Sequence, residues 1–364
     1  MQITDIKFEA YRWPRTKPIT NGLYTYTHAG LNAIIVETDE NVQGLGLTTD
    51  LASENIISAV VEALKPALIG KDPFDNERHW HEMWRPKLVG RRGLTTRAIG
   101  AIDIALWDIK GKALGIPLYK LLGGFTNKVE AYVAGGYYEK GKGLKELADE
   151  MKSHLDIGAR AVKMKIGGVP INEDIERVKV VREAIGKDIK LMVDANNAYR
   201  HYQAMEVARK IEEYDVFWFE EPVEPDDYEG SAIIARSTST PIAAGENEYT
   251  KYGFRDMINA RSADILQPDA LVLGGITEFM KIAALAQAND LDISPHGAQE
   301  VHIHLVSAIP NGLILEFYND TVDPMWGKSY TETININDGY VSAPDLPGLG
   351  LELNKKELEK YRVL

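Results

Sequence analysis

Eight short apolar segments, separated by amphipathic helical patterns, restrict the folds that this chain can adopt. The segments recur at intervals of roughly 22 to 32 residues and begin near Val129, Ala161, Leu191, Val216, Pro241, Asp264, Asp292 and Leu313. One intervening pattern, residues 171–185, places its apolar side chains on a single helical stripe. Eight consecutive strand and helix units predict an α/β fold of the TIM type, a closed (β/α) barrel with its helices outside.

A doubly wound open sheet is the alternative fold for alternating strands and helices. That fold usually carries a Gly-rich phosphate loop after its first strand, and no such loop follows an early strand here. The barrel is therefore favoured. With 364 residues the chain has room for a barrel of about 250 residues and a smaller domain.

The parts of the chain outside the barrel pattern predict a capping domain. Residues 1–125 contain three β-rich stretches and two helical patterns, which indicates an α+β capping domain. Within it, residues 14–30 are polar and Tyr-rich, and we expect them to form a lid loop over the substrate. Residues 126–325 are assigned to the barrel. The Gly- and Pro-rich residues 326–364 are expected to form a tail that packs on the capping domain.

The charge and composition of the chain argue against several classes of function. A net charge of −13 and a pI near 5.2 disfavour nucleic acid or an anionic membrane as partner, because such surfaces need clustered Lys and Arg. No apolar run approaches the roughly 18 to 20 residues of a membrane span, and residues 1–13 carry charges that a secretory leader lacks. With 0 Cys, carboxylates and histidines remain as metal ligands. We expect a cytoplasmic protein with a small-molecule partner.

Ionisable residues lie at the ends of the predicted strands, where the active sites of such barrels are built. They are Lys163, Lys165, Asp194, Glu220, Glu221, Glu246, Asp269, His296 and Glu316. Residues two apart on a strand share a face, so Lys163 and Lys165 should both point into the barrel mouth, although solvated lysines are the ordinary alternative. Glu220 and Glu221 are adjacent and must point oppositely. At most one of these two glutamates can therefore be a ligand.

Carboxylates from three successive strands predict a metal site. Asp194, Glu220 and Glu246 should converge on one point, and converging anions repel one another unless a cation lies between them. Hard oxygen ligands favour Mg²⁺, Mn²⁺ or Ca²⁺ over zinc. The alternative is a set of salt bridges between the carboxylates and the two lysines.

A carboxylate and a histidine end neighbouring strands. Asp269 could hydrogen-bond one imidazole nitrogen of His296 and leave the other nitrogen facing the substrate. Farther along, His302 and His304 form a His-x-His pair in a predicted helix, where residues two apart do not face each other. We interpret this pair as packing or surface histidines rather than as metal ligands.

These residues, in this order, resemble the mandelate racemase subgroup of the enolase superfamily, and the resemblance covers nearly the whole chain. The matching motifs are Lys163-Met164-Lys165, Asp194-Ala195-Asn196, Glu220-Glu221-Pro222, Gly245-Glu246-Asn247, Gln267-Pro268-Asp269, Pro295-His296-Gly297 and Leu315-Glu316, together with residues 101–108 and 344–350. The resemblance implies a capped barrel enzyme. It also implies a homo-oligomer, either a dimer or an octamer.

The resemblance implies a metal and a base. Mg²⁺, with Mn²⁺ as the alternative, would be bound by Asp194, Glu220 and Glu246 and would stabilise the enediolate made from a carboxylate substrate. Lys165 would take the α-proton on one face of the substrate. Lys163 would lower the pKa of Lys165 and help to hold the substrate carboxylate. The choice of Glu220 as the ligand, rather than its neighbour, rests on the resemblance.

The resemblance also implies roles on the other side of the site. His296, oriented by Asp269, would act as base or acid on the opposite face of the substrate. Glu316 would hydrogen-bond the carboxylate as it becomes an enediolate. Asn196 would contact the substrate near the metal.

Two reactions fit this set of residues. One is dehydration of a sugar acid, an aldonate or aldarate, to a 2-keto-3-deoxy acid, which would make the protein a hydro-lyase, a carbon–oxygen lyase. The other is racemisation or epimerisation of a 2-hydroxy acid with Lys165 and His296 as opposed bases. We favour dehydration, because the resemblance in residues 14–30 is closer to acid-sugar dehydratases, and Tyr26 and His28 suit polyol hydroxyls. An inactive carbohydrate-acid-binding protein on the same fold is a third hypothesis.

Overall fold

The N-terminal sheet consists of three antiparallel strands in the order β1-β2-β3. The computed structural model describes residues 1–49, 53–85 and 92–364. Its first elements are β1 Ile3–Thr20, β2 Thr25–Thr38, β3 Gln43–Thr49, α1 Glu54–Leu64, η1 Lys65–Ala67, α2 Asn76–Trp84, α3 Leu94–Leu114 and α4 Leu118–Leu121. Helix α3 packs directly on β3. The backbones are so close that a Cβ added to Gly46 would lie 1.8 Å from the Ala101 carbonyl oxygen. The predicted α+β character of this segment is confirmed.

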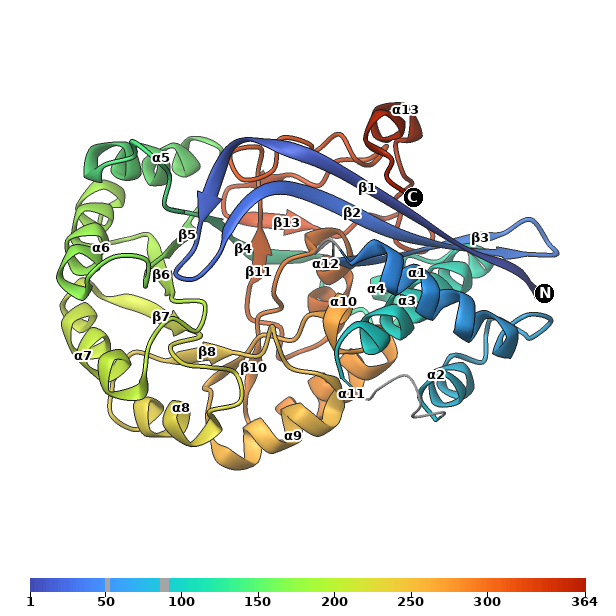
Figure 1. Ribbon diagram of the computed structural model, residues 1–364. Coiled ribbons are helices and arrows are strands. Elements are labelled where there is room, and N and C mark those ends of the chain that lie inside the picture. The colour runs from blue at the N-terminus through green and yellow to red at the C-terminus, as the bar shows by residue number, and fades with distance from the viewer. Residues whose placement is uncertain (50–52, 86–91) are drawn as a thin grey trace.

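The stretch predicted as a lid loop, residues 14–30, is mostly a β-hairpin. Strands β1 and β2 stay paired as far as Thr20 and Thr25, with a bulge between Pro14 and Ile19. The Thr- and Tyr-rich composition that suggested a loop equally favours strands, and proline is tolerated at bulges. The prediction of a loop was therefore wrong. The hairpin extends from the capping side toward the region of β5 and β6 (Figure 1).

Eight parallel strands form the barrel, and the predicted TIM-type fold is confirmed. They are β4 Lys128–Gly135, β5 Ala161–Lys165, β6 Lys190–Asp194, β7 Val216–Glu220, β8 Ile242–Ala244, β9 Ile265–Leu266, β10 Asp292–Ile293 and β11 Leu315–Phe317. Each begins within two residues of its predicted start. Strands β4 to β10 are adjacent in chain order, and β11 pairs with β4. The barrel closes between β10 and the segment that leads into β11. There the backbone of Ile293 makes hydrogen bonds with the backbones of Asn311 and Leu313, both at 2.8 Å.

Helices cover the outside of the barrel, as Figure 1 shows. They are α5 Leu144–Asp156, α6 Ile171–Ile185, α7 His201–Ile211, η2 Glu212–Tyr214, α8 Tyr228–Ala235, α9 Thr250–Ala260, α10 Ala270–Leu273, α11 Ile276–Gln287 and α12 Gln299–Ala308. Met192 and Trp218 belong to the interior cluster, whereas Val193 packs with the outer helices. Because side chains alternate along a strand, Asp194 and Glu220 also point inward, one layer nearer the mouth.

The C-terminal tail contacts both the barrel and the capping domain. Its hairpin, β12 Ile336–Asn337 and β13 Tyr340–Ser342, pairs with the beginning of β4. Buried Asp108 of α3 accepts hydrogen bonds from the backbone N–H groups of Leu45 and Leu349, both at 2.8 Å. After α13 Lys355–Leu358 and η3 Glu359–Tyr361, the chain ends beside β1. In the described ranges, no helix has the length and apolarity needed to cross a membrane.

A buried carboxylate in α12 gives a stability prediction. Burial, and then the charge of Asp323, raises the pKa of Glu300 from 4.5 to about 7. The folded state therefore disfavours the ionised form, so this contribution to stability is complete below pH 4.5 and is lost as the pH rises through 7. We expect Glu300→Gln to be more stable than the parent protein at pH 8, by on the order of 2 kcal/mol, and similar to it at pH 5.

Thermal unfolding of both proteins across pH 5 to 8 measures this difference. Glu332→Gln, at an exposed position, is the matched control and should leave the profile unchanged. Parallel pH profiles for Glu300→Gln and the parent would show that Glu300 does not titrate differently on folding.

Candidate metal and proton-transfer site

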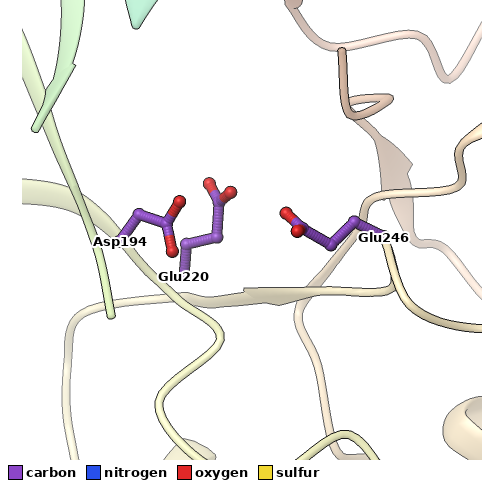
Figure 2. A group of neighbouring side chains, drawn as sticks. All are labelled: Asp194, Glu220 and Glu246. Atoms are coloured by element: carbon purple, nitrogen blue, oxygen red, sulfur yellow. The ribbon is translucent and has the colours of Figure 1, made fainter. Parts of the chain in front are cut away.

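Three carboxylates meet inside the barrel mouth. Asp194 ends β6, Glu220 ends β7, and Glu246 lies in the loop after β8. One oxygen atom of each lies within 4.8 Å of the others. In Figure 2 the carboxylates of Asp194 and Glu220 lie side by side, and that of Glu246 points toward them from the other side. The structure thus brings together the three residues that the sequence proposed as ligands.

This cluster has the chemistry of a hard-cation site. Asp194 and Glu220 are fully buried, and Glu246 Oε2 is buried with no hydrogen-bond partner among the described residues. Burial, and then the charge of Asp194, raises the pKa of Glu220 to about 8. Repulsion of this kind disappears when a divalent cation lies between oxygen ligands, so the residues fit Mg²⁺ or a similar ion.

Two buried lysines from β5 border the carboxylates. Lys163 Nζ lies 2.6 Å from Glu220 Oε1 and 2.7 Å from Glu316 Oε1, and Lys165 donates to Asp194. The salt bridges that the sequence offered as an alternative to a metal are therefore present beside the triad. Burial and the charge of Lys163 lower the pKa of Lys165, but Asp194, Tyr137 and Glu246 together outweigh them, so the net shift is upward.

The histidine lies on the other side of the triad. His296 Nδ1 is 3.1 Å from Asp269 Oδ2, and its Nε2 is 3.6 Å from Glu246 Oε2. Burial lowers the pKa of His296, but Glu246 and the hydrogen bond to Asp269 hold it well above its usual value. For Glu316, burial raises the pKa, but the charges of Lys163 and then His296 bring it down to about 2.

The tip of the β1–β2 hairpin lies over the lysine side of the site. A Cβ added to Gly22 would be 2.9 Å from the carbonyl oxygen of Ala195, so the tip contacts the loop after β6. Burial raises the pKa of Tyr26 to about 12, and Lys165 is among the charges that act on it. His28 is exposed and contacts Thr27 Oγ1 at 2.9 Å. Its position gives no support to the substrate-binding role that the sequence suggested.

Two residues near the triad have strained backbones. Asn196 has φ +41°, its backbone N–H donates to Asp194 Oδ1 at 2.8 Å, and its buried Oδ1 has no hydrogen-bond partner among the described residues. Glu221 also has φ +41°, and its carboxylate accepts a hydrogen bond from Asn247 at 2.8 Å. Left-handed backbone is costly for residues with a side chain and tends to persist at functional sites. The carboxylate cluster found among the described residues includes Glu220 and not Glu221.

Sequence reasoning missed several residues that support the site. Trp218 Nε1 donates to Glu220 Oε2 at 2.9 Å, and the ring of Tyr137 lies 5.2 Å from Lys165 Nζ. Gln267, which stands in one of the matching motifs but was given no role, is fully buried with both side-chain polar atoms lacking hydrogen-bond partners among the described residues. Trp218 could have been predicted from the sequence, because side chains alternate along a strand and Trp218 lies two residues before Glu220 on the same strand.

Comparisons with known proteins agree with this geometry. Residues 3–123 match the family model "Mandelate racemase / muconate lactonizing enzyme, N-terminal domain", and residues 146–357 match "Enolase C-terminal domain-like". Arabinonate dehydratase of Saccharolobus solfataricus is 37% identical over 90% of this chain and 89% of its own length. The 3,6-anhydro-alpha-L-galactonate cycloisomerase of Streptomyces coelicolor is 34% identical over 99% of both.

A solved structure extends the likeness to three dimensions. L-talarate/galactarate dehydratase from Salmonella typhimurium LT2, liganded with Mg and L-lyxarohydroxamate, superposes with a TM-score of 0.92 at 31% identity. The superposition covers 100% of this chain and 93% of that one. With both family models matched and a capped barrel observed, the chain belongs to the mandelate racemase subgroup of the enolase superfamily.

Proposed function

We propose that this protein is a Mg²⁺-dependent hydro-lyase that dehydrates a sugar acid, an aldonate or aldarate, to a 2-keto-3-deoxy acid. The observation that carries the proposal is the placement of an amine and an imidazole on opposite sides of one carboxylate triad. Lys165 contacts Asp194 on the β5 side, and His296 approaches Glu246 on the β10 side. A substrate carboxylate at the triad would have its α-carbon between them.

The names of relatives support this reaction class. Relatives named as dehydratases of arabinonate, L-talarate or galactarate, D-xylonate and D-galactonate are 31 to 37% identical to this chain. All of these names describe loss of water from a sugar acid. The dehydratase structure with Mg and an acid-sugar analogue supports the choice of metal and of substrate class.

The proposed reaction assigns a task to each side of the site. Bound Mg²⁺ would neutralise the negative charge that builds up on the substrate carboxylate as the α-proton leaves. Asp194 holds Lys165 as an ammonium, and Lys165 would act as the base once Asp194 shared its charge with a bound cation. It takes the α-proton, and the electron pair of the C–H bond forms the C=C of the enediolate. Lys163 donates to the carboxylate oxygens, and Glu316 donates to them in its protonated form, which a second carboxylate beside it favours.

His296 would complete the elimination. Its Nε2 faces the triad while Asp269 holds Nδ1, so a protonated ring can donate from Nε2 to the β-hydroxyl. The β C–O bond then breaks, water leaves, and the resulting enol becomes the 2-keto-3-deoxy acid when a proton returns to the β-carbon.

A second candidate function uses the same first step. The cycloisomerase relative matches 99% of this chain and 99% of its own length. A cyclic acid-sugar derivative whose ring oxygen is attached at the β-carbon could lose its α-proton to Lys165 and expel that oxygen, which would open the ring without releasing water. Racemisation of a 2-hydroxy acid remains the third reaction that two opposed bases could perform.

A substrate panel distinguishes these reactions. The Mg²⁺-loaded protein would be incubated with aldonates, aldarates and their lactones or anhydro forms, and α-keto acid would be detected chemically and by NMR. We expect keto acid from at least one linear sugar acid. Solvent deuterium at the α-carbon without keto acid would replace dehydration by epimerisation. Turnover that survives complete chelation of metal would overturn the proposal.

A further inference from the structure

Hydrogen bonds from a buried histidine, His302, hold the loop that carries His296. His302 lies on α12 and is fully buried. Its Nδ1 is 2.7 Å from the Gly297 carbonyl oxygen, and its Nε2 accepts from the Ala270 backbone N–H at 2.9 Å. Ala270 follows Asp269, and Gly297 follows His296, so the imidazole of His302 joins the two loops whose side chains form the Asp269–His296 pair.

The hydrogen bonds fix the chemical state of His302. A carbonyl oxygen can only accept, so Nδ1 must carry the proton, and a backbone N–H can only donate, so Nε2 must not. His302 is therefore a neutral Nδ1–H tautomer. Its unprotonated Nε2 lies 3.6 Å from Asp269 Oδ1 and makes no hydrogen bond to it. Oδ1 accepts instead from the Leu271 N–H at 2.8 Å, which holds the Asp269 carboxylate with Oδ2 directed at His296.

The backbone of Gly297 is held on both sides of its Cα. Its carbonyl accepts from His302, and its N–H donates to Glu316 Oε2 at 2.6 Å. Gly297 has φ +60° and the next residue, Ala298, has φ +38°, so this segment departs from ordinary backbone conformations. Hydrogen bonds to the two peptide groups on either side of Gly297 keep the turn in that shape. The shape of this backbone turn fixes the direction in which the His296 side chain leaves the backbone.

We propose that His302 is a positioning residue that sets the orientation of the His296 imidazole, a proposal that rests on the function proposed above. Without its ring, the Gly297 carbonyl and the Ala270 N–H lose their partners, and the two loops are free to shift relative to each other. A displacement of about 1 Å at a reacting group can lower turnover by about 100-fold. Binding of metal should be unaffected, because the triad is carried by β6, β7 and the loop after β8.

The same helix provides a matched control. His304 is also fully buried and also joins two backbone groups: its Nδ1 accepts from the Tyr119 N–H at 3.3 Å, and its Nε2 lies 2.9 Å from the Leu349 carbonyl oxygen. These partners belong to α4 and the C-terminal tail, away from the Asp269–His296 pair. A substitution of His304 therefore removes a comparable buried clamp without touching the proposed catalytic loops.

The test compares His302→Leu with His304→Leu in the full-length Mg²⁺-loaded protein, using kinetics, metal titration and crystal structures. We expect His302→Leu to lower kcat by about 10- to 100-fold, with KM and Mg²⁺ affinity within about twofold of the parent. The contact between His296 Nδ1 and Asp269 Oδ2 should be broken. His304→Leu should lose comparable thermal stability but keep its kcat and that contact. His302→Asn keeps a donor toward the Gly297 carbonyl and should recover part of the activity. If His302→Leu does not fold, His302→Asn takes its place in the comparison.

Other outcomes would overturn the proposal. It fails if a folded His302 variant keeps its kcat, if His296 stays bonded to Asp269 in that variant, or if His304→Leu loses as much activity. The crystal structures decide the orientation of His296 even if no sugar acid is turned over. Failure of the dehydratase proposal is thus distinguishable from failure of this one.

Discussion

Replacing Lys165 with alanine is expected to lower turnover by about 100- to 10,000-fold, the usual contribution of a positioned general base. The protein should still bind Mg²⁺, because Lys165 donates to Asp194 and is not itself a ligand in the triad. Isothermal titration with Mg²⁺, together with steady-state kinetics, measures both quantities. Exchange of the α-proton with solvent should disappear along with turnover.

Lys190 provides the matched control for this substitution. It begins β6, at the end of the barrel opposite the triad, and pairs with Glu130 at 2.7 Å. Lys190→Ala should therefore leave turnover within about twofold, since substitutions away from the site act mainly on stability. His296→Asn should also cripple turnover while metal remains bound. Full activity in Lys165→Ala or in His296→Asn would remove that residue from the mechanism.

Replacing Glu220 with glutamine is expected to weaken Mg²⁺ binding by more than about 100-fold, beyond the 10- to 100-fold typical of outer-shell partners. The carboxylate of Glu220 lies in the triad, and an amide removes the negative charge that a hard cation needs. Turnover should fall in parallel and should recover in part at high Mg²⁺ concentration. Metal titration followed by assays across a range of Mg²⁺ concentrations measures this effect.

Glu221→Gln is the sharpest control, because the two glutamates are adjacent in the sequence. Burial, and then the charge of Glu246, holds the pKa of Glu221 well above 4.5, so a neutral glutamine is a mild replacement there. We expect Mg²⁺ affinity to change by less than about 10-fold. If Glu221→Gln abolishes metal binding and Glu220→Gln does not, the proposed assignment of the ligands is reversed.

The barrel could be predicted because its pattern is local and periodic. A strand such as Lys190–Asp194 alternates inward and outward side chains and ends in a polar residue, and the units from β5 to β11 each have an ionisable residue at or near the end of the strand. The carboxyl ends of parallel strands meet at one rim, so the end residues of the strands already indicated a common site. These inferences need only the direction and order of the strands.

The β1–β2 hairpin could not be predicted in the same way. Residues 14–30 contain prolines and polar tyrosines, which are compatible with a loop or with a strand that has a bulge. The choice was made by long-range pairing of β1 with β2 and by contact of the tip with the loop after β6. Such contacts depend on residues far apart in the sequence. For the same reason the placement of Tyr26 near Lys165, and the exposure of His28, required the fold.

The histidine pair on α12 also separates what the sequence could determine from what only the fold could. By itself the sequence determined that His302 and His304 lie on one helix and do not face each other, which argued against a shared metal. Only the tertiary structure decided that both are buried, that His304 joins α4 to the tail, and that His302 joins the two loops of the proposed catalytic pair. The physical reason is that a buried imidazole must find one donor and one acceptor, and packing alone decides which backbone groups supply them.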